Sequence, residues 1–156
     1  MKFEIPTKND IIIFLTNAKL NKEERDFLAK QDLSSFVDSL IYADMNFMQS
    51  YKVGSIFFGV EGNFIGALFG AIPVFDGVVE WYSYTDTRTS KYHFAKGILN
   101  YFDYLMSIPN LVRLQSTVLV NNKRAYNLHK KLGFKEEGMM RKYDGKNDYY
   151  MMAVVK

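Results

Sequence analysis

One segment decides the fold: residues 121–134 have the sequence NNKRAYNLHKKLGF. Asn122 is a residue type that caps the first turn of a helix, and the residues after it suit a helix as far as Leu132. Gly133 then supplies the left-handed conformation in which helices commonly end, and Phe134 begins the next expected strand. The segment therefore predicts a short helix that leads into a strand.

Strands and helices alternate around this segment. The expected elements are a helix over residues 94–107 and strands over residues 113–120, 134–142 and 149–155. The helix ends before Pro109, because a proline disfavours helical geometry at the residue that precedes it. A strand, a helix and a strand in succession from Val78 to Val120 imply a right-handed crossover that joins two parallel strands.

The first half of the chain predicts a short strand, three helices and then a meander of strands. The expected elements are a strand at residues 3–5, helices at 7–18, from Asn21 onward and at 33–47, and strands at 54–60, 64–72 and 78–85. Thr7 and Asp10 have the spacing of a capping box, and Asp76-Gly77 suits a tight turn between strands. The sequence thus predicts an α/β (α+β) fold: a mixed, mostly antiparallel sheet flanked by helices.

The composition favours a single domain over residues 1–156. Hydrophobic residues make up 48% of the chain and aromatic residues 16%, which is too apolar for a disordered protein. The absence of cysteine excludes disulfides, thiolate metal sites and a cysteine nucleophile, and we predict no metal site. The net charge of +3 is too small to predict nucleic-acid binding. No apolar run approaches the roughly 20 residues of a membrane helix, and no leader precedes the domain, so we expect a cytoplasmic protein.

The connection over residues 86–96 is a candidate anion site, because it follows a strand and opens a helix whose first amides lack intrahelical partners. Its donors are the cations Arg88, Lys91 and Lys96 and the hydroxyl groups of Thr89 and Ser90. A pyrophosphate fits these donors. Taken alone, the connection favours the alternative, a solvated loop before a capped helix.

The segment at 121–134 resembles the signature of the N-acetyltransferases of the GNAT superfamily, whose usual form is Asn-x-x-Ala-x-x-Leu-Tyr-x-x-x-Gly-Phe. The residues that follow are similar to the ribosomal-protein acetyltransferase branch: Glu136-Glu137-Gly138, Arg141, Asp144-Gly145 and Asp148. The resemblance is good from residue 112 to the C-terminus, and the spacing of elements extends it back to residue 78.

The resemblance implies an acetyl-CoA cleft between two parallel strands that splay apart, here residues 78–85 and 113–120. The pyrophosphate loop of the family, Gln/Arg-x-x-Gly-x-Gly/Ala, would fall on residues 90–95. Ser90 and His93 depart from that pattern, and the histidine either crowds the phosphates or donates to them. The implied cofactor-binding residues are Tyr84, Thr85, Arg88, Ser90, Lys91, Tyr92, His93, Phe94, Ala95, Lys96, Asn122, Ala125 and Tyr126.

The resemblance also implies three catalytic candidates. His129 occupies the position of the tyrosine that protonates the departing coenzyme A thiolate, and a histidine can act as an acid near neutral pH. Glu80 lies close to where several family members place a basic carboxylate, and Tyr143 is a second candidate acid. The alternatives are a cross-strand ion pair or an exposed strand face for Glu80, and a partly exposed helix position for His129.

Two functions follow from these residues. The first is an acetyl-CoA-dependent N-acetyltransferase that acts by direct transfer on a primary amine of a protein or small molecule. The second is a catalytically lapsed protein of the same fold, of a type found in bacteriophages, that acts through protein contacts. A nucleic-acid-binding module ranks last. The acceptor and the oligomeric state, a homodimer included, stay open, and the expected setting is the cytoplasm of a bacterial or phage-infected cell.

Overall fold

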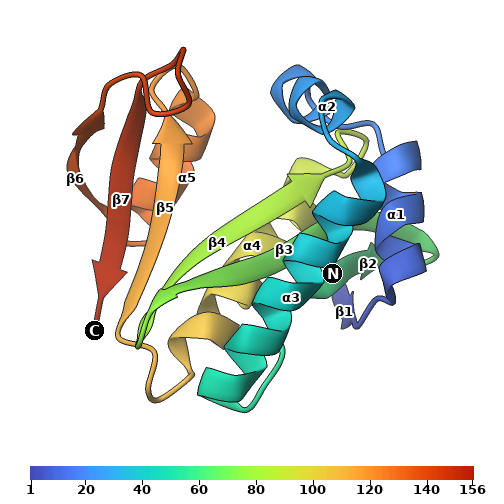
Figure 1. The fold of residues 1–156 in the computed structure, drawn as a ribbon, viewed down its shortest axis with the longest axis horizontal. Helices are drawn as coiled ribbons and strands as arrows, with labels where there is room; N and C mark the ends of the chain where they lie inside the picture. Colours follow the sequence, from blue (N-terminus) through green and yellow to red (C-terminus); the bar gives the residue numbers. More distant parts are fainter.

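The computed structural model describes residues 1–156, and its twelve elements follow the predicted order (Figure 1). The helices are α1 (Lys8–Asn17), α2 (Lys22–Ala29), α3 (Leu33–Tyr51), α4 (Lys91–Met106) and α5 (Lys123–Lys131). The strands are β1 (Lys2–Glu4), β2 (Phe57–Glu61), β3 (Phe64–Phe75), β4 (Val78–Thr85), β5 (Arg113–Leu119), β6 (Lys135–Met140) and β7 (Tyr149–Val155).

The strands form one seven-stranded sheet in the order β1-β2-β3-β4-β5-β7-β6. Every neighbouring pair is antiparallel except β4 and β5, which are parallel. The parallel pairing runs only from Val78 opposite Arg113 to Glu80 opposite Gln115, and the two strands then diverge, as Figure 1 shows. The predicted sheet and its splayed parallel pair are therefore confirmed.

Helices cover both faces of the sheet and enclose two hydrophobic cores. On one face α1 and α3 pack against β2 and β3, with Val37, Phe58 and Leu68 among the buried side chains. On the other face α4 packs beneath the centre of the sheet, where Tyr101 and Phe69 stack. Figure 1 shows α3 in front of β3 and β4 and α4 behind them, so β4 has a front face and a back face.

Helix caps account for most of the element boundaries. Thr7 and Asp10 form the predicted capping box of α1, and Asn122 caps α5 as expected. Two helices differ from the prediction: α3 continues to Tyr51, and α4 begins at Lys91, because Ser90 is its N-cap. No helix of the structure combines the length and the apolar character that crossing a membrane requires.

Candidate active site

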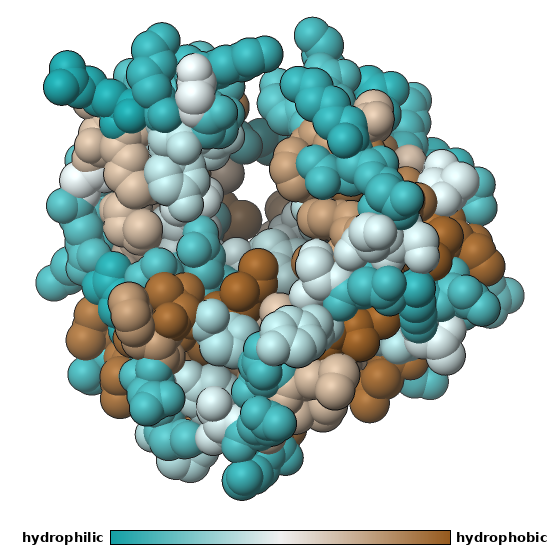
Figure 2. Space-filling view, in the orientation of Figure 1, coloured by the Kyte–Doolittle hydropathy of each residue, from teal (hydrophilic) through white to brown (hydrophobic).

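A cleft opens where β4 and β5 separate. Its volume is about 760 Å³, which lies within the range of small-molecule sites. The walls come from β4, β5, the N-terminal turns of α4 and α5, and the start of α2. Figure 2 shows the molecule hollowed between the half that holds β5 to β7 and the half that holds α2, with hydrophilic residues at the rim.

The backbone of β4 offers unpaired amides to this cleft. Asp86 donates its amide to the carbonyl of Gly66 on β3 at 2.8 Å. Because antiparallel ladders alternate, the amides of Trp81, Ser83 and Thr85 point the opposite way, away from β3. The last bridge of the parallel ladder, Glu80 opposite Gln115, uses the amide of Trp81, so the amides of Ser83 and Thr85 are the ones that face the cleft without a partner on β5. A ligand chain with carbonyl oxygens can accept them.

The first turn of α4 has the free amides that the sequence predicted for an anion site. Ser90 caps the helix and accepts the amide of His93, while the amides of Lys91 and Tyr92 lie in the turn that has no intrahelical acceptor. The positive end of the helix and the side chain of Lys91 both lie at the cleft wall. Together they form an electropositive anchor for an anion.

The side chain of His93 does not block this anchor. Its Nδ1 lies 2.9 Å from the carboxylate of Glu61, at the end of β2, and 2.6 Å from the hydroxyl of Ser90. It is absent from the lining of the cleft. The departure from glycine at this position therefore leaves the helix end open.

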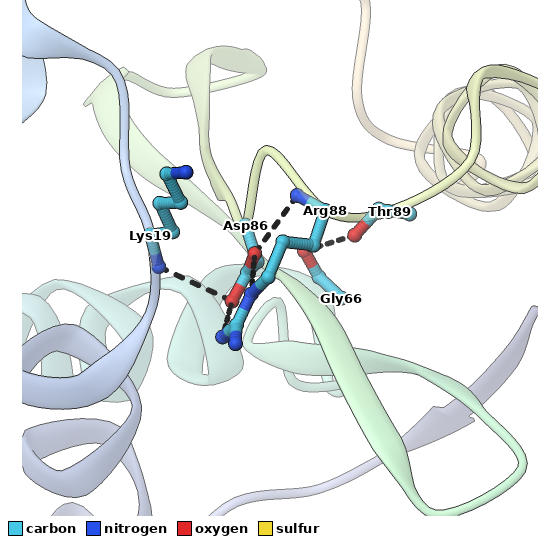
Figure 3. A network of polar contacts seen from close by, with 5 residues as sticks. All are labelled: Lys19, Gly66, Asp86, Arg88 and Thr89. Carbon is cyan, nitrogen blue, oxygen red and sulfur yellow. Dashed lines mark hydrogen bonds and ion pairs between the residues drawn. The ribbon is translucent and has the colours of Figure 1, made fainter.

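Arg88 lies elsewhere than the sequence predicted, as Figure 3 shows. Its guanidinium forms two hydrogen bonds to the carboxylate of Asp86, at 3.0 and 2.7 Å, and lies over the ring of Phe64. The side chain of Asp86 is only 2% exposed and also accepts the amides of Arg88 and Lys19. Because this network holds Arg88 on the side of α1 and β3, the prediction that it contacts the cofactor has no geometric support.

The start of α5 lines the wall opposite β4. The side chain of Asn122 accepts the amide of Ala125 at 3.1 Å, and both residues border the cleft together with Arg124. Tyr126 points to the other side of the helix, where its hydroxyl donates to Glu136 at 3.0 Å. Asn122 and Ala125 therefore remain candidates for cofactor contacts, and Tyr126 does not.

His129 bridges the two walls through the indole of Trp81. The Nε1–H of Trp81 donates to Nε2 of His129 at 3.2 Å, which requires the hydrogen on Nδ1, and Nδ1 donates to the carbonyl of Ala125 at 2.7 Å. Burial lowers the pKa of His129, although the hydrogen bond to Ala125 opposes the shift. The neutral imidazole thus has no proton available at Nε2, which argues against the predicted role as an acid.

Of the other two catalytic candidates, Glu80 borders the cleft and Tyr143 does not. Glu80 Oε1 accepts the hydroxyl of Thr117 on β5 at 3.2 Å, at the point where the strands begin to separate. Tyr143 is 53% exposed in the turn between β6 and β7 and packs on Tyr149. No cross-strand ion pair engages Glu80, which leaves its carboxylate directed at the cleft.

Sequence reasoning missed one titratable residue of the cleft, Glu24 on α2. Its Oε1 accepts the side-chain amide of Asn21, while its Oε2 is buried without a hydrogen-bond partner. Burial raises the pKa of Glu24 to about 7; the nearby Glu23 adds to this shift and the backbone amide of Thr85 opposes it. The spacing of Asn21 and Glu24 indicated a helix start, but nothing local indicated that the carboxylate faces the cleft.

The structure thus divides the predicted site residues into two groups. Those that line the cleft are Glu80, Thr85, Lys91, Phe94, Ala95, Asn122, Ala125 and His129. Those that do not are Tyr84, Arg88, Ser90, Tyr92, His93, Lys96, Tyr126 and Tyr143.

Comparison with known families agrees with this geometry. Residues 4–154 match the family model described as an acetyltransferase (GNAT) domain. The chain belongs to the GNAT family. No curated protein matches it in sequence. Acetyltransferases of the GNAT family use acetyl-CoA, so the cleft between β4 and β5 corresponds to the place where the resemblance implied that cofactor.

Several solved structures share the GNAT fold with this chain at low identity. A ribosomal-protein-alanine N-acetyltransferase from Brucella melitensis superposes with a TM-score of 0.75 and 13% identity, covering 100% of both chains. A chimeric spermidine N-acetyltransferase from Vibrio cholerae and hSSAT gives 0.74 and 18%, covering 99% of this chain and 96% of that one. A Salmonella typhimurium acetyltransferase, described as putative and solved with acetyl-CoA, gives 0.66 and 15%, covering 99% and 92%. At these identities the likeness shows the fold alone.

The residues of this GNAT cleft fit acetyl-CoA. The amides of Ser83 and Thr85, which have no partner on β5, suit the amide carbonyls of the cofactor's arm. The first turn of α4 and the side chains of Lys91 and Arg124 suit its phosphates. Donors for the arm and for the phosphates therefore occur along one continuous cleft.

Proposed function

We propose that this protein transfers an acetyl group from acetyl-CoA to a primary amine. The observation that carries the proposal is the three-residue pairing of β4 and β5. It leaves a cleft with backbone donors on one strand, a helix N-terminus at one end and the carboxylate of Glu80 where the strands part. A donor thioester and an acceptor amine can meet at that point.

Acetyl-CoA, when bound, supplies an acetyl group activated as a thioester. Lys91, Arg124 and the first amides of α4 hold its phosphates, and the amides of β4 orient its arm. These groups are fixed by secondary structure before any ligand arrives, so little reorganisation is needed when the reaction occurs. Binding in this orientation places the reacting carbonyl near the amides where the strands separate.

Glu80 acts as the base in this proposal. An amine must lose a proton in order to attack a carbonyl, and a carboxylate at the point of divergence accepts that proton directly or through one water. The hydroxyl of Thr117 holds the carboxylate in position across the two strands.

The departing sulfur needs no enzyme acid in this scheme. A thiol has an ordinary pKa near 8.5, so its thiolate leaves readily close to neutral pH. His129 then has a positioning role: it fixes the indole of Trp81 between β4 and α5 and so sets the separation of the two walls.

The open cleft favours catalysis over a lapsed site. A lapsed cofactor site would be filled by side chains, and His93, the most serious departure from the family pattern, lies against Glu61 instead. The cleft keeps a volume of about 760 Å³ with its donors unpaired.

Calorimetry with acetyl-CoA and a thiol-release assay with octylamine test the proposal. We expect binding by the wild type and by Glu80→Gln, and a kcat for Glu80→Gln that is lower by about a hundredfold. The substitution keeps the shape of the side chain and the hydrogen bond from Thr117, so the loss reports the basic carboxylate. Failure to bind acetyl-CoA at high protein concentration would refute the proposal.

A further inference from the structure

The front face of β4 carries a row of side chains that the proposed reaction uses only at one end. Glu80, Tyr82 and Tyr84 occupy alternate positions of the strand, so they share one face. Tyr82 and Tyr84 pack with the core of α1 and α3, which identifies this face as the front one. From Glu80 to Tyr84 the strand rises four residues, or roughly 13 Å.

A second carboxylate lies at the far end of this row. Glu24 of α2 is close enough to Tyr84 that its charge helps raise the pKa of that phenol to about 12, an effect in which burial is the larger cause. The same carboxylate faces the backbone amide of Thr85, the last residue of β4. Glu80 and Glu24 thus mark the two ends of one wall.

Glu24 lacks the partners that a buried carboxylate normally has. Its one side-chain donor is the amide of Asn21, the backbone amide of Thr85 lies nearby, and Oε2 is buried without a hydrogen-bond partner. No cation of the protein pairs with it. A buried charged oxygen without a partner is costly, and a cationic ligand would supply the missing hydrogen bond and the missing charge.

The charges of the cleft are divided between its walls. Lys91 and Arg124 belong to the N-terminal turns of α4 and α5, where the phosphates of acetyl-CoA are expected. Glu80 and Glu24 belong to β4 and α2. The anionic acetyl donor would therefore bind at the cationic wall, and a cationic amine acceptor would bind at the acidic wall.

We propose that Glu24 binds a second cationic group of an elongated acceptor whose reacting amine lies at Glu80. This inference rests on the proposed function and names its acceptor class: amines that carry two positive charges separated by a spacer comparable with the Glu80–Tyr84 span. The ring of Tyr82, which lines the cleft, offers an apolar surface for that spacer, and Tyr84 packs beside it with ring centroids 6.1 Å apart. A monocation can satisfy only one of the two carboxylates.

The selectivity between a diamine and a monoamine tests this inference. The probes are three amines: octane-1,8-diamine, propane-1,3-diamine and octylamine. The extended chain of octane-1,8-diamine suits the span once each ammonium is a hydrogen-bond length from its carboxylate. Propane-1,3-diamine is too short, and octylamine carries a single charge. We expect the wild type to prefer octane-1,8-diamine over octylamine in kcat/KM, and Glu24→Gln to reduce that ratio about tenfold. Glu23→Gln removes a charge from the exposed neighbouring position and is expected to leave the ratio unchanged.

A binding measurement separates this inference from the proposed function. Calorimetry of octane-1,8-diamine with the coenzyme A-saturated protein should show a Kd that is about tenfold weaker in Glu24→Gln than in the wild type. An unchanged Kd, or a wild type that prefers octylamine or propane-1,3-diamine, would overturn the role of Glu24. Absence of thiol release with every amine would instead overturn the proposed function, while the binding result still decides the role of Glu24.

Discussion

Asp86 and Glu24 are two acids near the same end of β4, and their surroundings are opposite. Asp86 accepts hydrogen bonds from the side chain of Arg88 and from two backbone amides, and its pKa falls to about 2, chiefly because of the hydrogen bonds from the Arg88 side chain. Glu24 has a single side-chain donor and a buried oxygen without one, and burial raises its pKa to about 7. The first acid is satisfied within the protein and the second is not.

This contrast separates structural polar groups from those that await a ligand. A satisfied group stabilises the folded state, so its removal should lower the free energy of unfolding. A buried group without a partner costs stability, so its removal should raise that free energy. Satisfied and unsatisfied groups of this protein should therefore respond to substitution with opposite signs.

The largest effect is expected for Asp86→Ala. The substitution leaves the amides of Lys19 and Arg88 without their acceptor, so we expect the free energy of unfolding to fall by about 3 kcal/mol at pH 7. Because the pKa of Asp86 is lower in the folded state, its contribution is present above about pH 4 and disappears as the pH falls through about 2. Urea denaturation at pH 7 and at pH 2 measures both; equal losses at the two values would contradict the assignment.

Glu24→Gln is expected to act in the opposite direction. The folded-state pKa of Glu24 is raised, so ionisation of this carboxyl destabilises the fold progressively as the pH rises from about 4.5 to about 7. At pH 8 the variant should be more stable than the wild type by about 2 kcal/mol, and at pH 4 the two should be equal. Thermal unfolding across this range checks the prediction, with Glu23→Gln as the matched control. If Glu24→Gln were less stable than the wild type at pH 8, Glu24 would be a satisfied structural acid like Asp86.

His129→Phe extends the comparison to a neutral group whose hydrogen bonds are satisfied. Loss of the imidazole leaves the indole N–H of Trp81 without an acceptor, so the free energy of unfolding should fall by roughly 1 to 2 kcal/mol. A positioning role predicts that kcat changes by less than about tenfold and that the pH profile of kcat keeps its shape. If the wild-type profile falls at alkaline pH and the His129→Phe profile does not, the result would support His129 as the acid.

The smallest effect is expected for Tyr82→Phe. The hydroxyl of Tyr82 is buried against the backbone of Gly70 and has no hydrogen-bond partner. Removing it should raise the free energy of unfolding by about 0.5 to 1 kcal/mol, as for Glu24 but without any dependence on pH. Chemical denaturation of the variant at two pH values measures this; a destabilised variant would mean that the hydroxyl is satisfied in solution.

The fold was predictable from the sequence because its signals are local. The cap at Asn122, the stop at Gly133 and the alternating strands each act over a few residues, and together they determine the order of the elements. The divergence of β4 and β5 is not a local property. It came from the resemblance to a family, and the three-residue ladder from Val78 to Glu80 confirms it.

The site was predictable only in part, because side-chain partners depend on tertiary contacts. Arg88 has the charge expected of a phosphate ligand, but Asp86, two residues before it, holds its guanidinium. His93 departs from the family pattern, yet its ring lies against the carboxylate of Glu61, which is distant in sequence, and so stays out of the cleft. Glu24 reaches the cleft only because α2 packs beside the end of β4, and no pattern around residue 24 indicates that position.

The alternation of β4 also has a consequence for solvent exchange. The amides of Tyr82 and Tyr84 lie inside the ladder with β3, whereas those of Ser83 and Thr85 face the water of the cleft. Deuterium should therefore replace hydrogen quickly at every second residue of a single strand and slowly at the residues between. A ligand that accepts hydrogen bonds from the cleft-facing amides would slow their exchange and remove this alternation of rates. The change in exchange rate would therefore report ligand binding without any chemical step.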